Sequence, residues 1–139
     1  MRHRTAAATA VLLAALLAAC GGQPRTQVAS AASVTVNGND AKLNVVKCTQ
    51  VQWYRTINIG SDKAGATVRV DGRGAQVLLE SVRVQNLGGF TGMYSRGGGD
   101  DANISLNGEK YTISGTANGY MVDKPNEPAS ATFKITVAC

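Results

Sequence analysis

The cysteines are the residues of this chain most clearly suited to covalent chemistry, and the first of them follows an apolar run. Cys20 follows Leu17, Ala18 and Ala19 at the end of the apolar run 6–19. A thiol at this place can be joined to diacylglycerol through a thioether, and small residues before it let the backbone enter a signal peptidase. Leu17 would fill an apolar subsite of that enzyme. The spacing therefore predicts a lipobox, with cleavage before Cys20 and lipidation of Cys20.

The segment before Cys20 is typical of a secretory signal peptide. Arg2 and Arg4 precede the apolar run, whose fourteen residues fall short of the about 20 that a bilayer-spanning helix needs. We therefore expect residues 1–19 to be removed as a signal peptide. The alternative is a standard cleavage site that leaves Cys20 as an ordinary thiol.

The two remaining cysteines predict the redox environment of the mature chain. Cys48 and Cys139 form an even pair in an exported protein, so we expect a disulfide between them rather than free buried thiols. The bond would close a loop of roughly ninety residues, for which the chain-entropy model gives about 4–5 kcal/mol.

Other residues offer little support for catalysis or metal binding. His3 is the only histidine and lies in the predicted signal peptide, so histidine-based triads and histidine-ligated zinc are not expected in the mature chain. Asp100 and Asp101 could help to hold calcium, but such a site needs about six or more oxygen ligands at suitable spacing, so we favour a solvated loop. Gly97–Gly99 could cradle a phosphate only if a helix followed. We expect no catalytic residue, no metal site and no cofactor.

Three further side chains have two interpretations each. Glu80 lies inside an apolar run and is either a perturbed carboxylate or a solvent-facing residue paired with an arginine. Trp53 and Tyr54 could stack on a sugar. If their strand alternates, however, one of them faces the core and at most one is free.

The charge pattern argues against nucleic-acid binding. The chain has a net charge of +5, and removal of Arg2 and Arg4 leaves +3. Lysines and arginines fall singly between other residues, whereas a nucleic-acid footprint would be a basic patch interleaved with aromatic residues.

The mature chain divides into a tether and one domain. Residues 20–33 are small and polar without periodicity, which predicts a lipidated N-terminus followed by a flexible tether of about 20 Å. From Val34 to Cys139 apolar and polar residues alternate between turn signals. Expected strands lie at 33–36, 42–48, 53–59, 66–70, 76–85, 102–106, 111–117 and 132–139. We therefore predict an all-β domain, a small antiparallel β-sandwich or flattened barrel of about eight strands.

Several local features refine this prediction. Asn107-Gly108 separates two alternating runs and predicts a tight hairpin. Residues 118–129, which hold Pro125 and Pro128, are expected to form a loop. The run 76–85 places Leu78, Val82 and Val84 in register, so it is a bulged or doubly buried strand, with a short helix as the rival interpretation.

The order of these elements resembles the mycobacterial nineteen-kilodalton lipoprotein antigen family. Val34–Asp40 is similar to the start of that family's domain, and Phe133–Cys139 to its ending. Tyr111–Gly119 resembles the family's Y-x-I-T-G-T-A-x-G stretch. The resemblance extends over nearly the whole mature domain and depends on the order of the motifs together with the two cysteines.

The resemblance implies an exported antigen of the cell envelope, held on the extracytoplasmic face of the cell membrane by acyl chains on Cys20. It also implies recognition of that lipid by the innate receptor for bacterial lipopeptides. The family's type member has a long tether rich in hydroxyl residues that can be glycosylated. The tether is short here, so glycosylation and lectin-mediated adhesion are not expected. The alternative function is a carrier or sensor of an apolar envelope ligand bound between the sheets. An enzyme is a third hypothesis, and no feature determines the oligomeric state.

Overall fold

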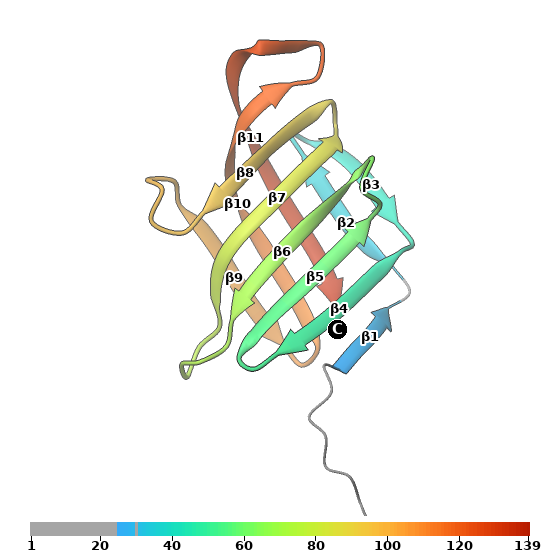
Figure 1. Cartoon of the computed structure of the whole chain (residues 1–139), viewed down its shortest axis with the longest axis vertical. Helices are drawn as coiled ribbons and strands as arrows, with labels where there is room; N and C mark the ends of the chain where they lie inside the picture. Colours follow the sequence, from blue (N-terminus) through green and yellow to red (C-terminus); the bar gives the residue numbers. More distant parts are fainter. Residues whose placement is uncertain (1–24, 30) are drawn as a thin grey trace, which may run out of the picture.

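The computed structural model describes residues 25–29 and 31–139, so Cys20 and the predicted signal peptide 1–19 lie outside the described residues. The described chain forms a single antiparallel sheet of eleven strands (Figure 1). The strands are β1 (Arg25–Ala29), β2 (Ala32–Val36), β3 (Asn39–Leu43), β4 (Val46–Val51), β5 (Tyr54–Gly60), β6 (Gly65–Asp71), β7 (Leu78–Leu87), β8 (Phe90–Ser95), β9 (Ala102–Asn107), β10 (Lys110–Met121) and β11 (Lys124–Ala138).

The sheet folds over on itself into two layers. One layer has the order β1-β4-β5-β6-β7-β8 and the other the order β9-β10-β11-β2-β3. The long strand β10 joins the layers, because its first half pairs with β9 and its second half, at 118–121, pairs with β8. Figure 1 shows β4 to β8 in front of β10, β11 and β2. The result is a nearly closed, flattened barrel, which confirms the predicted fold class.

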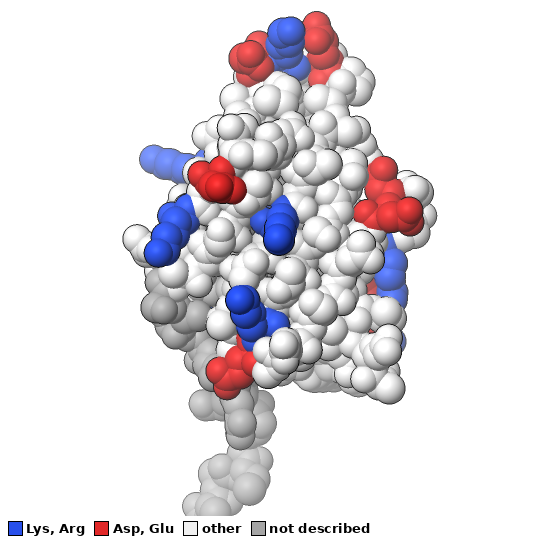
Figure 2. Space-filling view, turned by 180° about the vertical axis from the view of Figure 1, so that it is seen from behind, with Lys and Arg blue, Asp and Glu red and all other residues white. Residues whose placement is uncertain are grey.

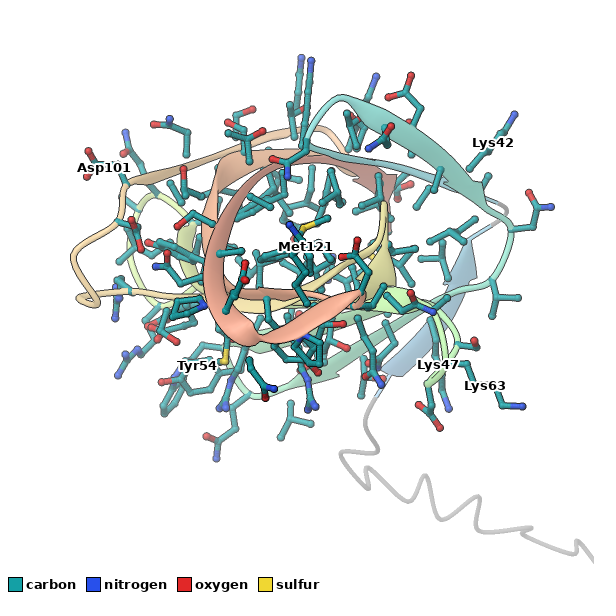
Figure 3. All side chains as sticks on the ribbon, turned by 90° about the horizontal axis from the view of Figure 1, so that it is seen from above. Lys42, Lys47, Tyr54, Lys63, Asp101 and Met121 are labelled. Carbon is teal, nitrogen blue, oxygen red and sulfur yellow. A yellow bond between two sulfur atoms is a disulfide. The ribbon has the colours of Figure 1, made fainter. Side chains whose placement is uncertain are left out.

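Alternate residues of both layers fill the space between them. Seen along the barrel, side chains occupy its interior, while Lys42, Lys47, Lys63 and Asp101 point outward (Figure 3). Burial of each valine, isoleucine or phenylalanine side chain is worth about 1.5–3 kcal/mol relative to exposure. The largest fully buried side chains are Phe90, Ile57, Ile113, Ile135, Val34, Val36, Val46, Val68, Val70, Val82, Val84 and Val137.

The number of strands is larger than predicted. Eleven strands replace the expected eight, and two segments in which no strand was expected belong to the sheet. Residues 25–29 were assigned to the tether but form β1, which pairs with β4. Residues 118–129 were assigned to a loop, but they extend β10 and β11 into a long hairpin with its turn at 122–123. A register irregularity after Tyr120 accommodates the prolines, which cannot donate a backbone hydrogen bond.

Two tight turns follow from residues that tolerate positive φ. Asn37 and Gly38 have φ values of 48° and 79°, as a type I′ turn between paired strands requires. The hairpin predicted at Asn107-Gly108 exists, but its turn is shifted by one residue. Asn107 pairs with Lys110, so the turn consists of Gly108 and Glu109 rather than Asn107 and Gly108.

A bulge in β7 explains an error in the predicted core. Arg69 is opposite Ser81 and Val70 is opposite Leu79, so Glu80 is an extra residue without a partner on β6. The bulge changes the alternation, as two residues on one strand oppose one on the other. Leu79 is consequently buried and Leu78 is exposed, whereas the sequence pattern placed Leu78 in phase with the buried Val82 and Val84.

The predicted disulfide is present and connects the two layers. Cys48 lies on β4, and Cys139 follows β11. Both side chains are buried, and their Cα atoms are 6.1 Å apart. The β8–β10 pairing already joins the two layers. The disulfide joins them a second time, at another place, because it links β4 of one layer to the residue that follows β11 of the other. Within the described ranges, the chain contains no helix long and apolar enough to cross a membrane.

Candidate functional site

Aromatic rings, arginines and an ion pair of the described residues lie together at one end of the barrel. This basal end consists of the start of β1, the turn 52–53, the loop 72–77, the turn 108–109 and the C-terminus. Backbone hydrogen bonds of 2.9 Å join these segments, from Gly72 N to the Trp53 carbonyl and from Cys139 N to the Glu109 carbonyl. The start of β1 belongs to the same end because Arg25 is opposite Gln50 on β4.

An ion pair between the buried Asp71 carboxylate and the half-exposed Arg73 anchors the loop at the basal end. The side chain of Asp71 is 4% exposed and that of Arg73 is 52% exposed. Arg73 Nε donates to both carboxylate oxygens at 3.0 Å, and its backbone N donates to Oδ1, also at 3.0 Å. The side-chain hydrogen bond and then the backbone hydrogen bond lower the pKa of Asp71 to about 2. The carboxylate therefore stays ionised, and it holds the loop against β6.

Arginine side chains pack on the aromatic rings beside this pair. The Arg69 guanidinium lies 4.4 Å from the centre of the Tyr54 ring. The guanidinium of Arg73 lies 5.6 Å from the Trp53 ring and 5.5 Å from that of Tyr54. These distances fall within the range of cation–π attraction. The basal end thus presents aromatic faces and fixed positive charge together.

A surface hollow of about 410 Å³ opens beside this cluster. Arg55 lies at its wall, where its Nε donates to Gln50 Oε1 at 2.9 Å and its Nη1 donates to the Tyr111 hydroxyl at 3.3 Å. Trp53 lines the same hollow and is 41% exposed. The hollow is open to solvent and mixed in polarity, so it can contact a partner that offers both apolar and anionic groups.

The prediction for Trp53 and Tyr54 was half wrong. We expected one of the two rings in the core, but neither is buried. Trp53 lies in the turn before β5, and its ring centre is 6.0 Å from that of Tyr54. The two arginines that pack on them, Arg69 and Arg73, were missed by sequence reasoning. Arg69 reaches Tyr54 only because residue 54 pairs with residue 71, which puts Arg69 on the diagonal.

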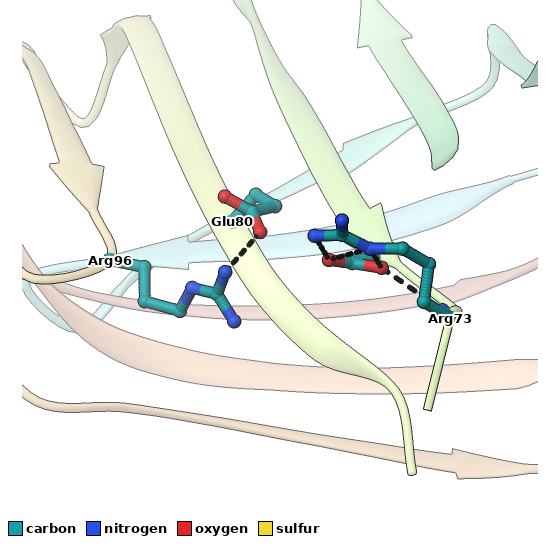
Figure 4. A network of polar contacts seen from close by, with 4 residues as sticks. Arg73, Glu80 and Arg96 are labelled. Carbon is teal, nitrogen blue, oxygen red and sulfur yellow. Dashed lines mark hydrogen bonds and ion pairs between the residues drawn. The ribbon is translucent and has the colours of Figure 1, made fainter. Parts of the chain in front are cut away.

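Of the two interpretations of Glu80, the structure supports the carboxylate paired with an arginine. Its Oε1 lies 2.6 Å from Nη2 of Arg96, and its side chain is 25% exposed (Figure 4). Figure 4 shows this pair beside the Asp71–Arg73 pair, on adjacent strands of the same layer. The extra position created by the bulge turns Glu80 toward Arg96, so the carboxylate is part of a surface ion pair.

The glycine-rich loop does not assemble a site. Asp100 accepts a hydrogen bond from Nδ2 of Asn118, and Asp101 is exposed. The loop that holds Gly97–Gly99 leads into strand β9 instead of the helix that a phosphate cradle would need. Among residues 25–29 and 31–139, no three His, Cys, Asp or Glu side chains gather in a way that could hold a metal ion.

Charged residues on the visible back face are spread out, as predicted. Figure 2 shows lysines, arginines and acidic residues of this face mostly as separate groups, with both signs at the tip of the β10–β11 hairpin. Of the three cysteines, Cys48 and Cys139 form the predicted disulfide. Cys20, the predicted lipidation site, lies outside the described residues and stays a prediction.

Comparison with known proteins shows the family to which the chain belongs. The model of the Mycobacterium 19 kDa lipoprotein antigen matches residues 25–139, the whole of the described sheet. A protein of Mycobacterium indicus pranii that bears a lipoprotein name is 58% identical over 139 residues, which is 100% of both chains. The lipoprotein LppE of Mycobacterium tuberculosis is 33% identical over 97% of this chain and 96% of its own. Lipoprotein LpqH of Mycobacterium avium is 35% identical over 80% of this chain and 70% of its own. The chain therefore belongs to the Mycobacterium 19 kDa lipoprotein antigen family.

Proposed function

We propose that this chain is a lipid-anchored lipoprotein of the cell envelope with a non-catalytic β-domain. The observation that carries the proposal is the lipobox ending at Cys20, placed directly before a domain that matches a lipoprotein antigen family. Acyl chains on Cys20 would enter the bilayer with about 0.8 kcal/mol per buried CH₂, and two or more chains make such anchoring stable.

The proposed domain boundaries follow the lipobox and the start of the sheet. Residues 1–19 form the signal peptide, and the mature chain begins at Cys20. The folded domain starts at Arg25, where β1 begins, so the linker to the lipid is shorter than the 20–33 segment expected from the sequence. A short linker keeps the domain close to the membrane surface.

The proposed location is the extracytoplasmic face of the cell membrane. The Cys48–Cys139 disulfide supports it, because structural disulfides persist in oxidising compartments outside the cytoplasm. As a surface antigen, the protein would meet the host mainly through its lipid. The innate receptor for bacterial lipopeptides would read Cys20 and its acyl chains, with no contribution required from the β-domain.

Substitution of Cys20 tests the anchor. We expect Cys20→Ala to move the mature protein from the membrane fraction to the soluble fraction, and to abolish signalling through the lipopeptide receptor in reporter cells. Gly22→Ala, two residues further along, is the matched control and should leave both readouts unchanged. Continued membrane association of the Cys20→Ala protein, or an intact mass without acyl groups in the wild type, would refute the proposal.

The carrier hypothesis finds no specific support in the described part of the chain. It requires a ligand cavity between the sheets, whereas core side chains such as Phe90, Ile57 and Ile113 pack there with almost no exposed area. The hollow at the basal end lies at the surface. Native mass spectrometry of the purified protein would revive this hypothesis if it detected a co-purifying apolar ligand.

A further inference from the structure

We infer that the basal end of the barrel is a membrane-facing surface that rests on anionic phospholipid headgroups. This inference rests on the lipid anchor proposed at Cys20 and goes beyond it, because an anchor alone does not determine which surface of the domain meets the bilayer. The position of the chain start, the exposed apolar side chains and the distribution of charge all point to the same end.

The short link between lipid and domain selects the basal end. Arg25 is the fifth residue after Cys20, and five fully extended residues span at most about 18 Å. Arg25 is opposite Gln50 at the start of β1, so the lipid must lie near the basal end. The tip of the β10–β11 hairpin is the far end of the barrel (Figure 1), and the twelve residues of β10 put it roughly 40 Å away.

Whereas the β10–β11 hairpin has exposed Tyr120 and Val122, the basal end has four exposed large apolar side chains. Eight large apolar residues of the described chain are exposed, and four of them lie there: Val51 (56%), Trp53 (41%), Leu78 (46%) and Leu106 (41%). Residue 51 pairs with residue 54, residue 78 with residue 71, and residue 106 with residue 111. These pairings place all four residues at the basal end of their strands, and Trp53 also lines the hollow. Tryptophan is enriched at the membrane interface, where its ring meets the headgroups.

The charge of the two ends favours the same orientation. The basal end carries four basic side chains, two acidic ones and the C-terminal carboxylate, a balance of +1, whereas the hairpin tip carries two acidic side chains and one basic, a balance of −1. The basal residues are Arg55, Arg69, Arg73, Lys110, Asp71 and Glu109, and the tip residues are Asp123, Lys124 and Glu127. Basic groups near a bilayer are attracted to anionic headgroups. The charge of Asp71 is already neutralised by Arg73, which leaves Arg69 and Lys110 free to face lipid phosphates.

Trp53 is the only tryptophan of the chain and therefore serves as an internal probe. We would reconstitute the full-length mature lipoprotein into vesicles of phosphatidylcholine and phosphatidylglycerol and record its emission. We expect Trp53 emission at shorter wavelength than in the unanchored Cys20→Ser protein, with quenching by lipids brominated near the headgroup. The matched control is Trp53→Phe with Tyr120→Trp, which moves the probe to the hairpin, where residue 120 is also exposed. That probe should not be quenched by the brominated lipids.

Charge variants test the role of the headgroups. Arg69→Gln should reduce the quenching of Trp53 in anionic vesicles, and Lys124→Gln at the hairpin tip, which removes the same charge at the other end, should not. Loss of one basic contact corresponds to about a fivefold weaker local association. Vesicles of phosphatidylcholine alone should quench Trp53 less than anionic vesicles.

Co-flotation of the protein with vesicles tests the lipid anchor separately from the membrane-facing surface. If the wild-type protein fails to float with vesicles, the anchor proposal fails. If the protein floats but Trp53 is quenched no more than the Tyr120→Trp probe, the anchor stands and the membrane-facing surface is refuted. Shielding of Trp53 that appears only as the protein density in the vesicle rises would show contact between copies, which would also overturn the inference.

Discussion

Loss of the Cys48–Cys139 disulfide should remove a large part of the stability of the domain. The two cysteines are 91 residues apart, and for a loop of that length the chain-entropy model gives about 4.6 kcal/mol at 25 °C. Net stabilities of small domains are about 5–15 kcal/mol, so the reduced protein should be marginal. The loop contains β5 to β11 and leaves out only β1 to β3 and the start of β4, so almost the whole core is constrained when the chain unfolds.

The measurement is a pair of urea titrations on the unanchored Cys20→Ser protein, followed by circular dichroism in the oxidised form and after reduction. With an m-value of about 1.5–2 kcal/mol/M, the midpoint should fall by about 2–3 M. Cys48→Ala with Cys139→Ala is the independent variant, and it should show a similar decrease without reductant. Because both sulfurs are buried, reduction is expected only under conditions that open the barrel. A stability loss below about 1 kcal/mol would refute the loop-entropy reasoning.

Three smaller perturbations test other features. Hydrogen bonds lower the pKa of Asp71 to about 2, so the ionised carboxylate stabilises the fold fully above about pH 4 and loses this effect as the pH falls through 2. Asp71→Asn should therefore reduce the change in the unfolding free energy, measured with urea, between pH 4 and pH 2. An unchanged pH dependence in this variant would contradict the reasoning. A Cβ on Gly119 would overlap the backbone of Thr91 across the β8–β10 junction, so Gly119→Ala should cost about 1–3 kcal/mol and increase amide exchange at 118–121. The control Gly38→Ala has open space around the new atom but φ +79°, so it should cost about 1 kcal/mol without affecting the β8–β10 junction. Equal amide exchange at 118–121 in Gly119→Ala and Gly38→Ala would contradict this prediction. Glu80→Gln removes a partly exposed ion pair and should change the unfolding free energy by less than about 1 kcal/mol, whereas a larger loss would indicate an essential bulge contact.

Much of the fold was predictable because its signals are local. The alternation of apolar residues around Ile57, Val68 and Ile135 has the period of a strand, and all three side chains are buried as that period requires. The turn at Asn37-Gly38 was also readable, since both residues tolerate positive φ. The errors arose where the period was interrupted. Glu80 adds one residue to β7, and one residue is enough to exchange the two faces of a strand.

The candidate site was much less predictable. Trp53 and Tyr54 were recognisable as candidates because adjacent aromatic rings can stack on a sugar. Their arginine partners were not, since Arg69 and Arg73 come from β6 and the loop that follows it. No local pattern in the chain records which residue of β6 lies opposite Tyr54. The basal end therefore became visible only with the pairing of the strands.

The sequence by itself determined which residues this protein has for chemistry and for strands: a cysteine in a predicted lipobox, two further cysteines that can pair, and strand-forming runs between turn residues. These depend on residue type and short spacing, which a linear chain displays directly. The tertiary structure decided which strands are neighbours, that residues 25–29 join the sheet, and that one end of the barrel gathers aromatic rings and guanidinium groups. Those results depend on register and bulges between segments distant in the chain, where a shift of one residue reverses the side that each side chain faces.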